Sequence, residues 1–218
     1  MTSTNMPFKK NDLTRFFLFL INHGHTSKIE SFNSYLTEME NKFHKDINKL
    51  GKSYKSYIET LSPNENTYDI DDDFAEQHSE ITHKVNNIFR RSFIVSLHSY
   101  LESTLEEIIR ILNTKKGTTL QKKPRHKSTL QHYKETLENE FSVSFLSIKN
   151  EWAFMIDENT IRNNIVHNNG KPSKQTHKVV NKNPEISIKD GELIITKSYL
   201  TNLLLNIDKI LLHVIKEI

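Results

Sequence analysis

The chain contains no cysteine, and only five glycines and five prolines occur among its 218 residues. Without cysteine it can form neither a disulfide nor a thiolate metal site, and it has no cysteine nucleophile. So few turn-forming residues argue against a sandwich of many short strands. The longest apolar run, residues 16–21, is too short to cross a bilayer, and no small-residue cleavage site follows it. We therefore expect a soluble, cytoplasmic protein without membrane contact.

Motifs of several enzyme classes are also missing. The scattered glycines form neither a P-loop nor a dinucleotide-binding fingerprint, and no G-x-S-x-G or H-E-x-x-H sequence occurs. Among the 11 histidines, His23 and His25 lack a nearby carboxylate, and His78 and His83 are badly spaced for joint ligation from one helical face. We expect neither a metal site nor a cofactor.

What the chain does contain is a helical pattern, with 35% apolar and 26% charged residues and a net charge of +3. Apolar residues recur at steps of three and four over residues 26–61, and again over residues 74–112. This periodicity predicts two long amphipathic helices. We expect a short helix over residues 13–21, stopped by Asn22-His23-Gly24, and a solvated acidic loop at residues 69–73.

Four serines lie on one stripe of the second long helix: Ser92, Ser96, Ser99 and Ser103. Small side chains allow a neighbouring helix to approach closely, whereas hydroxyl groups on one stripe also suit a polar site. We favour close packing for this stripe.

The rest of the sequence predicts shorter helices and one hairpin. We expect helices over residues 128–141, capped by Ser128, and over residues 147–167, followed by a polar loop. Asp190-Gly191 between alternating apolar residues predicts a β-hairpin, after which Ser198 would cap a final helix.

The predicted fold class is all-α, a helical bundle with long helices and one small, late β-hairpin. Residues 1–73 would form an N-terminal helical segment, an arm plus a long helix that packs on the bundle. Residues 74–218 would form the core, and together the two parts would make one compact domain.

The most distinctive segment is Arg162-Asn163-Asn164-Ile165-Val166-His167, at the end of a predicted helix. On a helical wheel Arg162 and Asn163 share the face of Trp152 and Met155. A cation on an apolar face is costly unless it is paired or functional. A carboxylate such as Glu102 would neutralise it; alternatively, the planar guanidinium would await a phosphate.

This segment resembles the R-x4-H motif of the HEPN superfamily, in the form with Asn after the Arg. Residues 89–102 resemble the long helix that precedes the motif in HEPN proteins of bacterial defence and toxin loci. The resemblance extends over residues 74–218 and implies an HEPN-like bundle that works as a homodimer. It also implies a metal-independent endoribonuclease that cleaves cellular RNA, a toxin or abortive-infection (antiviral defence) effector with a cognate antitoxin or defence-system partner.

Carried over by this resemblance, Arg162 and His167 are the catalytic pair and Asn163 is the orienting polar residue. In the helix that precedes the motif, Ser96 and Glu102 are candidate supporting polar residues. One position departs from the family. Toxins paired with a nucleotidyltransferase antitoxin often have a Tyr two residues after the His, where this chain has Asn169.

The residue types suit RNA cleavage by the substrate's own 2′-hydroxyl. Histidine can accept or donate a proton near neutral pH, and arginine stays charged and stabilises a developing anion. No carboxylate constellation in the sequence suggests a two-metal site. We expect cleavage that persists in EDTA and leaves a 2′,3′-cyclic phosphate.

A basic stretch precedes the motif, because no acid occurs between Ile108 and Lys134. We expect phosphate contacts from Lys122, Lys123, Arg125 and Lys127, together with Lys171 beside the motif; a solvated basic loop is the alternative. Two other functions also stay open: a non-catalytic HEPN module that binds RNA or nucleotide, and a helical protein-interaction protein.

Overall fold

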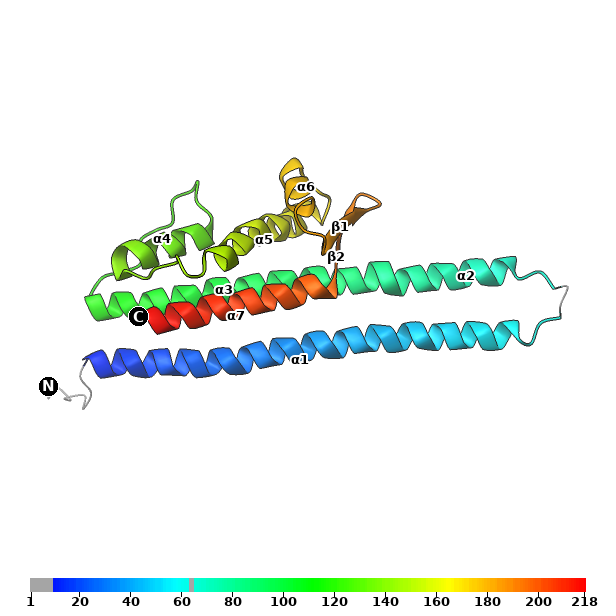
Figure 1. The fold of residues 1–218 in the computed structure, drawn as a ribbon, viewed down its shortest axis with the longest axis horizontal. Helices are drawn as coiled ribbons and strands as arrows, with labels where there is room; N and C mark the ends of the chain where they lie inside the picture. Colours follow the sequence, from blue (N-terminus) through cyan, green and yellow to red (C-terminus); the bar gives the residue numbers. More distant parts are fainter. Residues whose placement is uncertain (1–9, 63–64) are drawn as a thin grey trace, which may run out of the picture. The chain divides into compact units, whose positions relative to one another are not determined.

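A computed structural model describes residues 10–62 and 65–218, with side chains from Thr14 onward (Figure 1). The elements are, in chain order, α1 (Lys10–Ile58), α2 (Tyr68–Ser79), the π-helical turn η1 (Glu80–Val85), α3 (Asn86–Lys116), α4 (Thr129–Phe141), α5 (Lys149–Asn168), α6 (Lys174–Val180), β1 (Ile186–Lys189), β2 (Glu192–Ile195) and α7 (Lys197–Glu217). Over these residues the chain is mostly helical and has one two-stranded antiparallel sheet. The all-α prediction with a late hairpin is confirmed.

The expected helix break at Asn22-His23-Gly24 is wrong, because α1 runs through it without interruption. A glycine inside a helix costs about 1 kcal/mol relative to alanine, which neighbouring contacts can outweigh. Here the adjacent His25 is buried, with Nδ1 at 2.7 Å from the Tyr100 hydroxyl and Nε2 at 2.9 Å from Asp208 Oδ1. These tertiary contacts hold the turn that the glycine would loosen.

The expected acidic loop is also wrong, since Asp69 and Asp71 lie in the first turn of α2. Carboxylates are favourable there because they face the positive end of the helix dipole. Asp71 also accepts hydrogen bonds from Thr67 Oγ1, at 2.9 Å, and from the Tyr54 hydroxyl. The expected end of the first long helix at residues 62–64 lies partly outside the described residues. The second long helix is confirmed in outline, but η1 interrupts it.

Later elements follow the prediction with two differences. Ser128 caps α4 as expected, its Oγ accepting from the Gln131 amide at 3.2 Å, and the hairpin turns at Asp190 and Gly191, both with positive φ. The polar loop after α5 contains the short helix α6, which the sequence pattern did not predict. Ser198 is not the cap of α7, because Thr196 Oγ1 accepts from the Tyr199 amide at 3.1 Å.

The serine stripe of α3 is exposed, so the expectation of close packing within this chain is wrong. Ser92 and Ser103 direct their hydroxyls to backbone oxygens of their own helix, at 2.9 and 3.0 Å. Leucines on other faces of α3 form the core instead, such as Leu97 and Leu101, both fully buried.

The described chain forms two compact units, each built from several separate segments. The first contains the described residues up to 31, with residues 96–161 and 202–218. Its core joins α3, α4 and α7 through fully buried side chains: Leu105, Ile108, Leu130, Leu137, Leu203, Ile207 and Ile210. The second unit contains residues 32–95 and 162–201.

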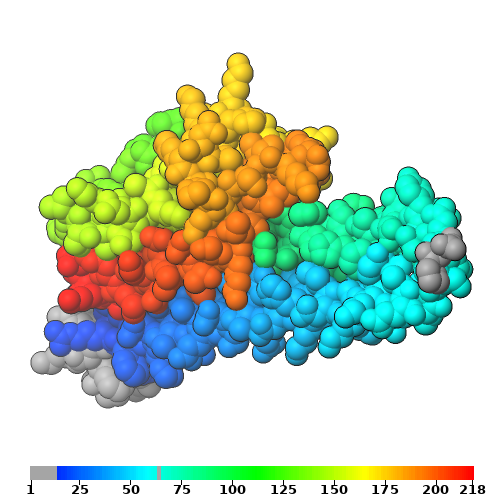
Figure 2. All heavy atoms as spheres, turned by 45° about the vertical axis from the view of Figure 1, so that its right-hand side comes forward, coloured from blue at the N-terminus to red at the C-terminus, as the bar shows by residue number. Residues whose placement is uncertain are grey.

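In the second unit, aromatic rings join α1 to α3. The Phe32–Phe93 and Phe43–Phe89 ring centroids are each 5.7 Å apart. Beside them Arg90 makes a bidentate ion pair with buried Glu40, both bonds 2.7 Å long, and donates to a backbone oxygen of β2. In Figure 2 the atoms of the segment that holds α6 and the hairpin, gold to orange, stand out at the surface of this unit.

Candidate functional site

The candidate motif occupies the last two turns of α5, in the second unit. Arg162 and Asn163 are half-buried, and His167 is exposed. Arg162 Nη1 donates a hydrogen bond of 3.0 Å to Asn163 Oδ1, while Arg162 Nε is buried without a hydrogen-bond partner. Within the described part of its own unit, no carboxylate forms an ion pair with Arg162.

The Arg162–Asn163 hydrogen bond has a consequence for orientation. Asn163 and His167 are four residues apart and therefore share one helical face, whereas Arg162 lies about 100° away around the helix. The bond to Asn163 draws the guanidinium toward the face that carries His167. An arginine, an amide and a histidine thus gather at one accessible helix end, although Arg162 and His167 are not hydrogen-bonded to each other in the described structure.

The turn after α5 is held by Asn164, which is buried. Its Nδ2 donates to the Lys171 backbone oxygen at 2.6 Å, and its own backbone oxygen accepts from Gly170 at 3.3 Å. Asn169 and Gly170 adopt positive φ angles of 50° and 78°, which terminate the helix. These bonds place the exposed Lys171 directly behind the motif, where the sequence predicts a phosphate contact.

Arg91, buried on α3, fastens the same turn to the hairpin. It donates to the Leu193 oxygen at 2.7 Å, to Glu192 Oε2 at 3.0 Å and more weakly to the Asn169 oxygen at 3.5 Å. Its guanidinium lies so close to Gly170 that a Cβ there would be 2.6 Å from Arg91 Cζ. A side chain at residue 170 would therefore adopt a strained φ of 78° and would also have to displace the Arg91 guanidinium.

The prediction that Arg162 and Asn163 share the buried face of Trp152 and Met155 on the motif helix is wrong. The buried stripe of α5 follows steps of three instead: Trp152, Met155, Glu158, Ile161 and Asn164. Val166 is 46% exposed, and Arg162 is only half-buried. Because an α-helix has 3.6 residues per turn, residues spaced three apart shift steadily around its axis, and different neighbouring segments cover the successive turns of α5. The cation thus avoids the full cost of burial that the helical wheel suggested.

Glu102, one candidate partner for Arg162, has a cation of its own in the first unit. His98 Nε2 lies 3.4 Å from Glu102, and His98 Nδ1 donates at 2.6 Å to fully buried Glu158. Burial lowers the pKa of His98, but the hydrogen bonds and charges of Glu102 and Glu158 outweigh it and raise that pKa to about 9. Ser96, the other supporting candidate, is exposed on α3.

Sequence reasoning missed this buried cluster. The signal was present: His98 and Glu102 stand four residues apart, and Glu158 falls on the same step of three as Trp152 and Met155. A charged residue within a buried helical stripe points to a partner on a neighbouring helix.

Of the four basic residues in the loop between α3 and α4, two make structural contacts and two make none within the described chain. Lys127 pairs with Glu135 and thereby lowers the pKa of that carboxyl, and Lys123 Nζ donates to the Lys127 oxygen at 2.8 Å. Lys122 and Arg125 are exposed and, among the described residues, make no hydrogen bond or ion pair. All four belong to the first unit, whereas Lys171 belongs to the second.

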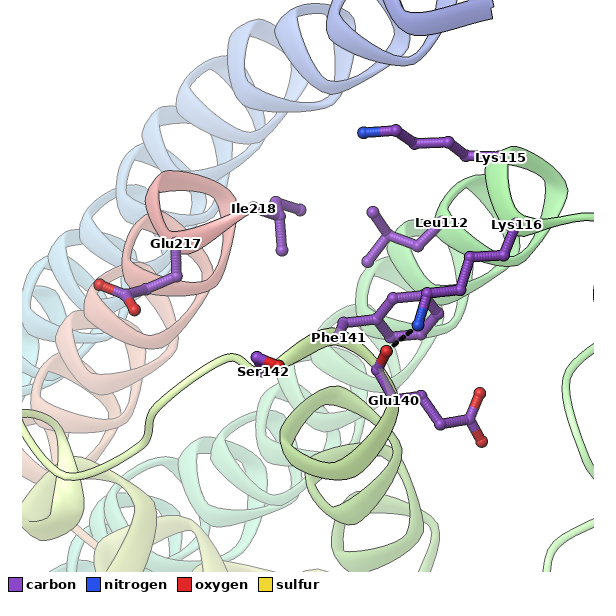
Figure 3. A pocket seen from close by; sticks show the side chains of 8 residues that line it. All are labelled: Leu112, Lys115, Lys116, Glu140, Phe141, Ser142, Glu217 and Ile218. Carbon is purple, nitrogen blue, oxygen red and sulfur yellow. Dashed lines mark hydrogen bonds between the residues drawn. The ribbon is translucent and has the colours of Figure 1, made fainter.

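A pocket of about 520 Å³ in the first unit is lined by residues from the ends of α3, α4 and α7 (Figure 3). The Lys116 ammonium reaches the Glu140 backbone oxygen and lies 4.4 Å from the centroid of the Phe141 ring. Leu112 and Ile218 supply apolar walls. The pocket contains no motif residue, and of its two lysines, Lys115 and Lys116, the second is engaged by these structural contacts.

Comparisons of the chain with family models, curated proteins and solved structures find no match. Across residues 10–62 and 65–218, no group of three or more acidic or histidine side chains converges as metal ligands. None of the helices in the described part of the chain combines the length and apolar content needed to cross a membrane.

Proposed function

We propose that this chain is a metal-independent endoribonuclease of the HEPN type, a toxin or antiphage-defence effector that cleaves cellular RNA. The observation that carries the proposal is the Arg162–Asn163 hydrogen bond of 3.0 Å, which turns the guanidinium toward the exposed His167. The protein would adopt an HEPN-like fold and act in the cytoplasm as a homodimer.

The proposed reaction uses the substrate's 2′-hydroxyl as nucleophile. His167 accepts the hydroxyl proton or donates one to the leaving 5′-oxygen, which its exposure permits. Arg162 stabilises the charged phosphorane, and Asn163 restricts the guanidinium to the productive side of the helix. One chain offers a single histidine at this site, so two motifs facing one cleft would supply both proton transfers.

The experiment measures cleavage of a defined single-stranded RNA in EDTA and identifies the product ends. We expect a 2′,3′-cyclic phosphate, a 5′-hydroxyl and no cleavage of DNA. His167→Ala should reduce the rate by about 10²–10⁴-fold, the usual contribution of a proton-transfer group. Arg162→Ala should be similarly damaging.

Asn163 provides a graded variant pair. Asn163→Asp keeps an oxygen acceptor for Arg162 and should retain most activity, whereas Asn163→Ala loses one hydrogen bond of about 1 kcal/mol, roughly fivefold in rate. Asn168→Ala, an exposed neighbour, is the control. Products with 3′-hydroxyl ends, or activity that requires added Mg²⁺, would overturn the mechanism.

Two other functions give different outcomes. A non-catalytic RNA-binding module would bind the same RNA without cleaving it. A helical interaction protein would lose stability with Arg162→Ala and show no effect on RNA. The second alternative is favoured by exposed apolar residues near the start of α1, where Phe16 and Phe19 are 55% and 64% exposed.

Asn169 limits the ways in which an antitoxin could inhibit the enzyme. An antitoxin that modifies a tyrosine two residues after the motif histidine would find no hydroxyl there. We propose that a cognate antitoxin or defence-system partner acts on this chain by another route.

A further inference from the structure

A second pocket lies in the same unit as the motif and has a volume of about 480 Å³. It is lined by the end of α2, by η1, by the start of α3, by the turn after α5 and by the hairpin. The polar lining includes His83, Lys84, Arg91, Asn169 and Lys189. We refer to these residues and their cavity as the hairpin pocket.

The hairpin pocket adjoins the motif through the chain itself. Asn169, on its wall, follows His167 by two residues, so their Cα atoms are at most about 7 Å apart. Arg91 holds the Asn169 oxygen and packs against Gly170, which fixes this wall. A ligand that extends from His167 past the end of α5 would therefore reach the pocket.

Two of the residues that line the pocket lie on a segment of unusual backbone conformation. His83 and Lys84 lie on η1, a π-helical turn of six residues. Such turns are rare, are less favourable than α-helix, and are often found at functional sites. The extra residue in a π turn changes the direction of the side chains after it, and here the turn lines the pocket with both residues.

The pocket is lined by more basic side chains than acidic ones. Glu192 is paired with Arg91 at 3.0 Å, which leaves Lys84 and Lys189 facing a single remaining carboxylate, Asp190. Lys84 has no hydrogen bond or ion pair among the described residues. The Lys189 ammonium lies 3.2 Å from His83 Nε2 and can donate to it only while that nitrogen is unprotonated.

We propose that the hairpin pocket binds a backbone phosphate of the RNA, adjacent to the scissile phosphate at the motif. This inference rests on the proposed ribonuclease function and names its second contact with substrate. Exposed ammonium groups act as strong point-charge donors to phosphate oxygens. A bound phosphate accepts hydrogen bonds from Lys84 and Lys189, and the His83 ring lies on the same wall of the pocket.

The test measures single-stranded RNA binding as a function of salt. The His167→Ala protein is the background, because it should leave the RNA intact. Lys84→Gln/Lys189→Gln should lower the slope of log K against log salt by about 0.7, because both lysines contact the same phosphate. The matched control is Lys174→Gln/Lys178→Gln, two exposed lysines on α6 outside the pocket, and its slope should stay closer to that of the background.

Cleavage kinetics in the active protein provide a second readout. Lys84→Gln/Lys189→Gln should raise KM for a long RNA at least several-fold while leaving kcat nearly unchanged. The effect should vanish with a dinucleotide whose only phosphate is the scissile one. A general loss of folding would instead reduce activity on both substrates.

The outcomes separate this inference from the proposed function. If the wild-type protein cleaves RNA but the pocket variant keeps the salt slope of the background, the phosphate site is refuted and the ribonuclease function is not. A reduced slope without any cleavage by the wild-type protein overturns the ribonuclease and keeps the pocket as an RNA-binding site. Absence of RNA binding at low salt overturns the pocket.

Discussion

At the scale of single residues, the first unit contains a buried carboxylate, Glu158, on the buried stripe of α5. Glu158 is fully buried, and one of its oxygens accepts a hydrogen bond of 2.6 Å from His98 Nδ1. A carboxylate in such a place is tolerated only when a cation stands beside it. The protonated form of His98 therefore stabilises this unit, and its raised pKa favours that form at neutral pH.

We predict a stability profile that follows the titration of His98. Its pKa of about 9 in the folded protein lies above the ordinary value of about 6.5, so its contribution is complete below pH 6.5 and disappears as the pH rises to 9. The free energy of unfolding should fall over this range by about 3 kcal/mol relative to His98→Gln/Glu158→Gln, which lacks both charges. Urea unfolding at stepped pH measures the difference.

His126→Gln serves as the control for this profile, because His126 is exposed in the loop before α4. It should leave the pH dependence of the wild type intact. A constant difference between wild type and the double variant from pH 6 to pH 9 would contradict a charged His98.

At the scale of elements, the C-terminal end of α5 determines the position of His167. The helix stops at two residues with positive φ, and Arg91 then binds this stop to β2. The hairpin thus has a specific role in the second unit. It supplies the backbone oxygen of Leu193 that holds the Arg91 guanidinium against Gly170.

Two glycines of the second unit test this arrangement. Gly170 and Gly191 have nearly equal φ angles of 78° and 76°, but only a Cβ on Gly170 would meet another group, the Arg91 guanidinium. Gly191→Ala should cost about 1 kcal/mol through backbone strain alone. Gly170→Ala should cost about 1–3 kcal/mol more, since displaced Arg91 leaves hydrogen-bonding groups unsatisfied.

Thermal or urea unfolding of the two variants gives these values, and RNA cleavage by Gly170→Ala should fall because the motif turn shifts. The extra cost should disappear when Arg91 is first replaced by Ala, as a double-mutant cycle would show. Equal costs for the two glycine variants would indicate that Arg91 does not constrain the turn.

At the scale of the whole molecule, the proposed reaction needs more groups than one motif provides. Val166, between Asn163 and His167 on α5, is 46% exposed beside the site. An apolar residue in that position suits an isologous contact, in which the same helix of a second copy packs against it. We expect a two-fold dimer whose axis lies near α5.

Val166→Glu should shift the protein toward monomer and reduce cleavage in parallel, because it places two like charges at the axis. Sedimentation velocity at micromolar concentration measures the first effect. Leu146→Glu, at a residue 79% exposed between α4 and α5, is the control and should remain dimeric and active. An active monomer in either the wild type or Val166→Glu would refute the shared site.

Several features follow from local sequence alone. The periodicity of apolar residues predicts the long helices, Ser128 predicts the start of α4, and Asp190-Gly191 predicts the hairpin turn. Each of these depends on a few neighbouring residues: a helical face, a side-chain cap, or two residues that tolerate positive φ. The position of Arg162 and His167 at a helix end also follows from the sequence, because Asn169-Gly170 marks the stop.

Other features were decided only by contacts between distant segments. Gly24 stays helical because His25 bonds to Tyr100 and Asp208, and 183 residues separate His25 from that aspartate. The buried side of α5 changes with the neighbours that cover each turn, so a helical wheel placed Arg162 on the wrong face. The hairpin pocket is likewise formed by segments that lie far apart in the sequence, from Ser79 at the end of α2 to Ile194 on β2. Local propensity is worth only tenths of a kcal/mol to about 1 kcal/mol per residue, and tertiary contacts of this kind outweigh it.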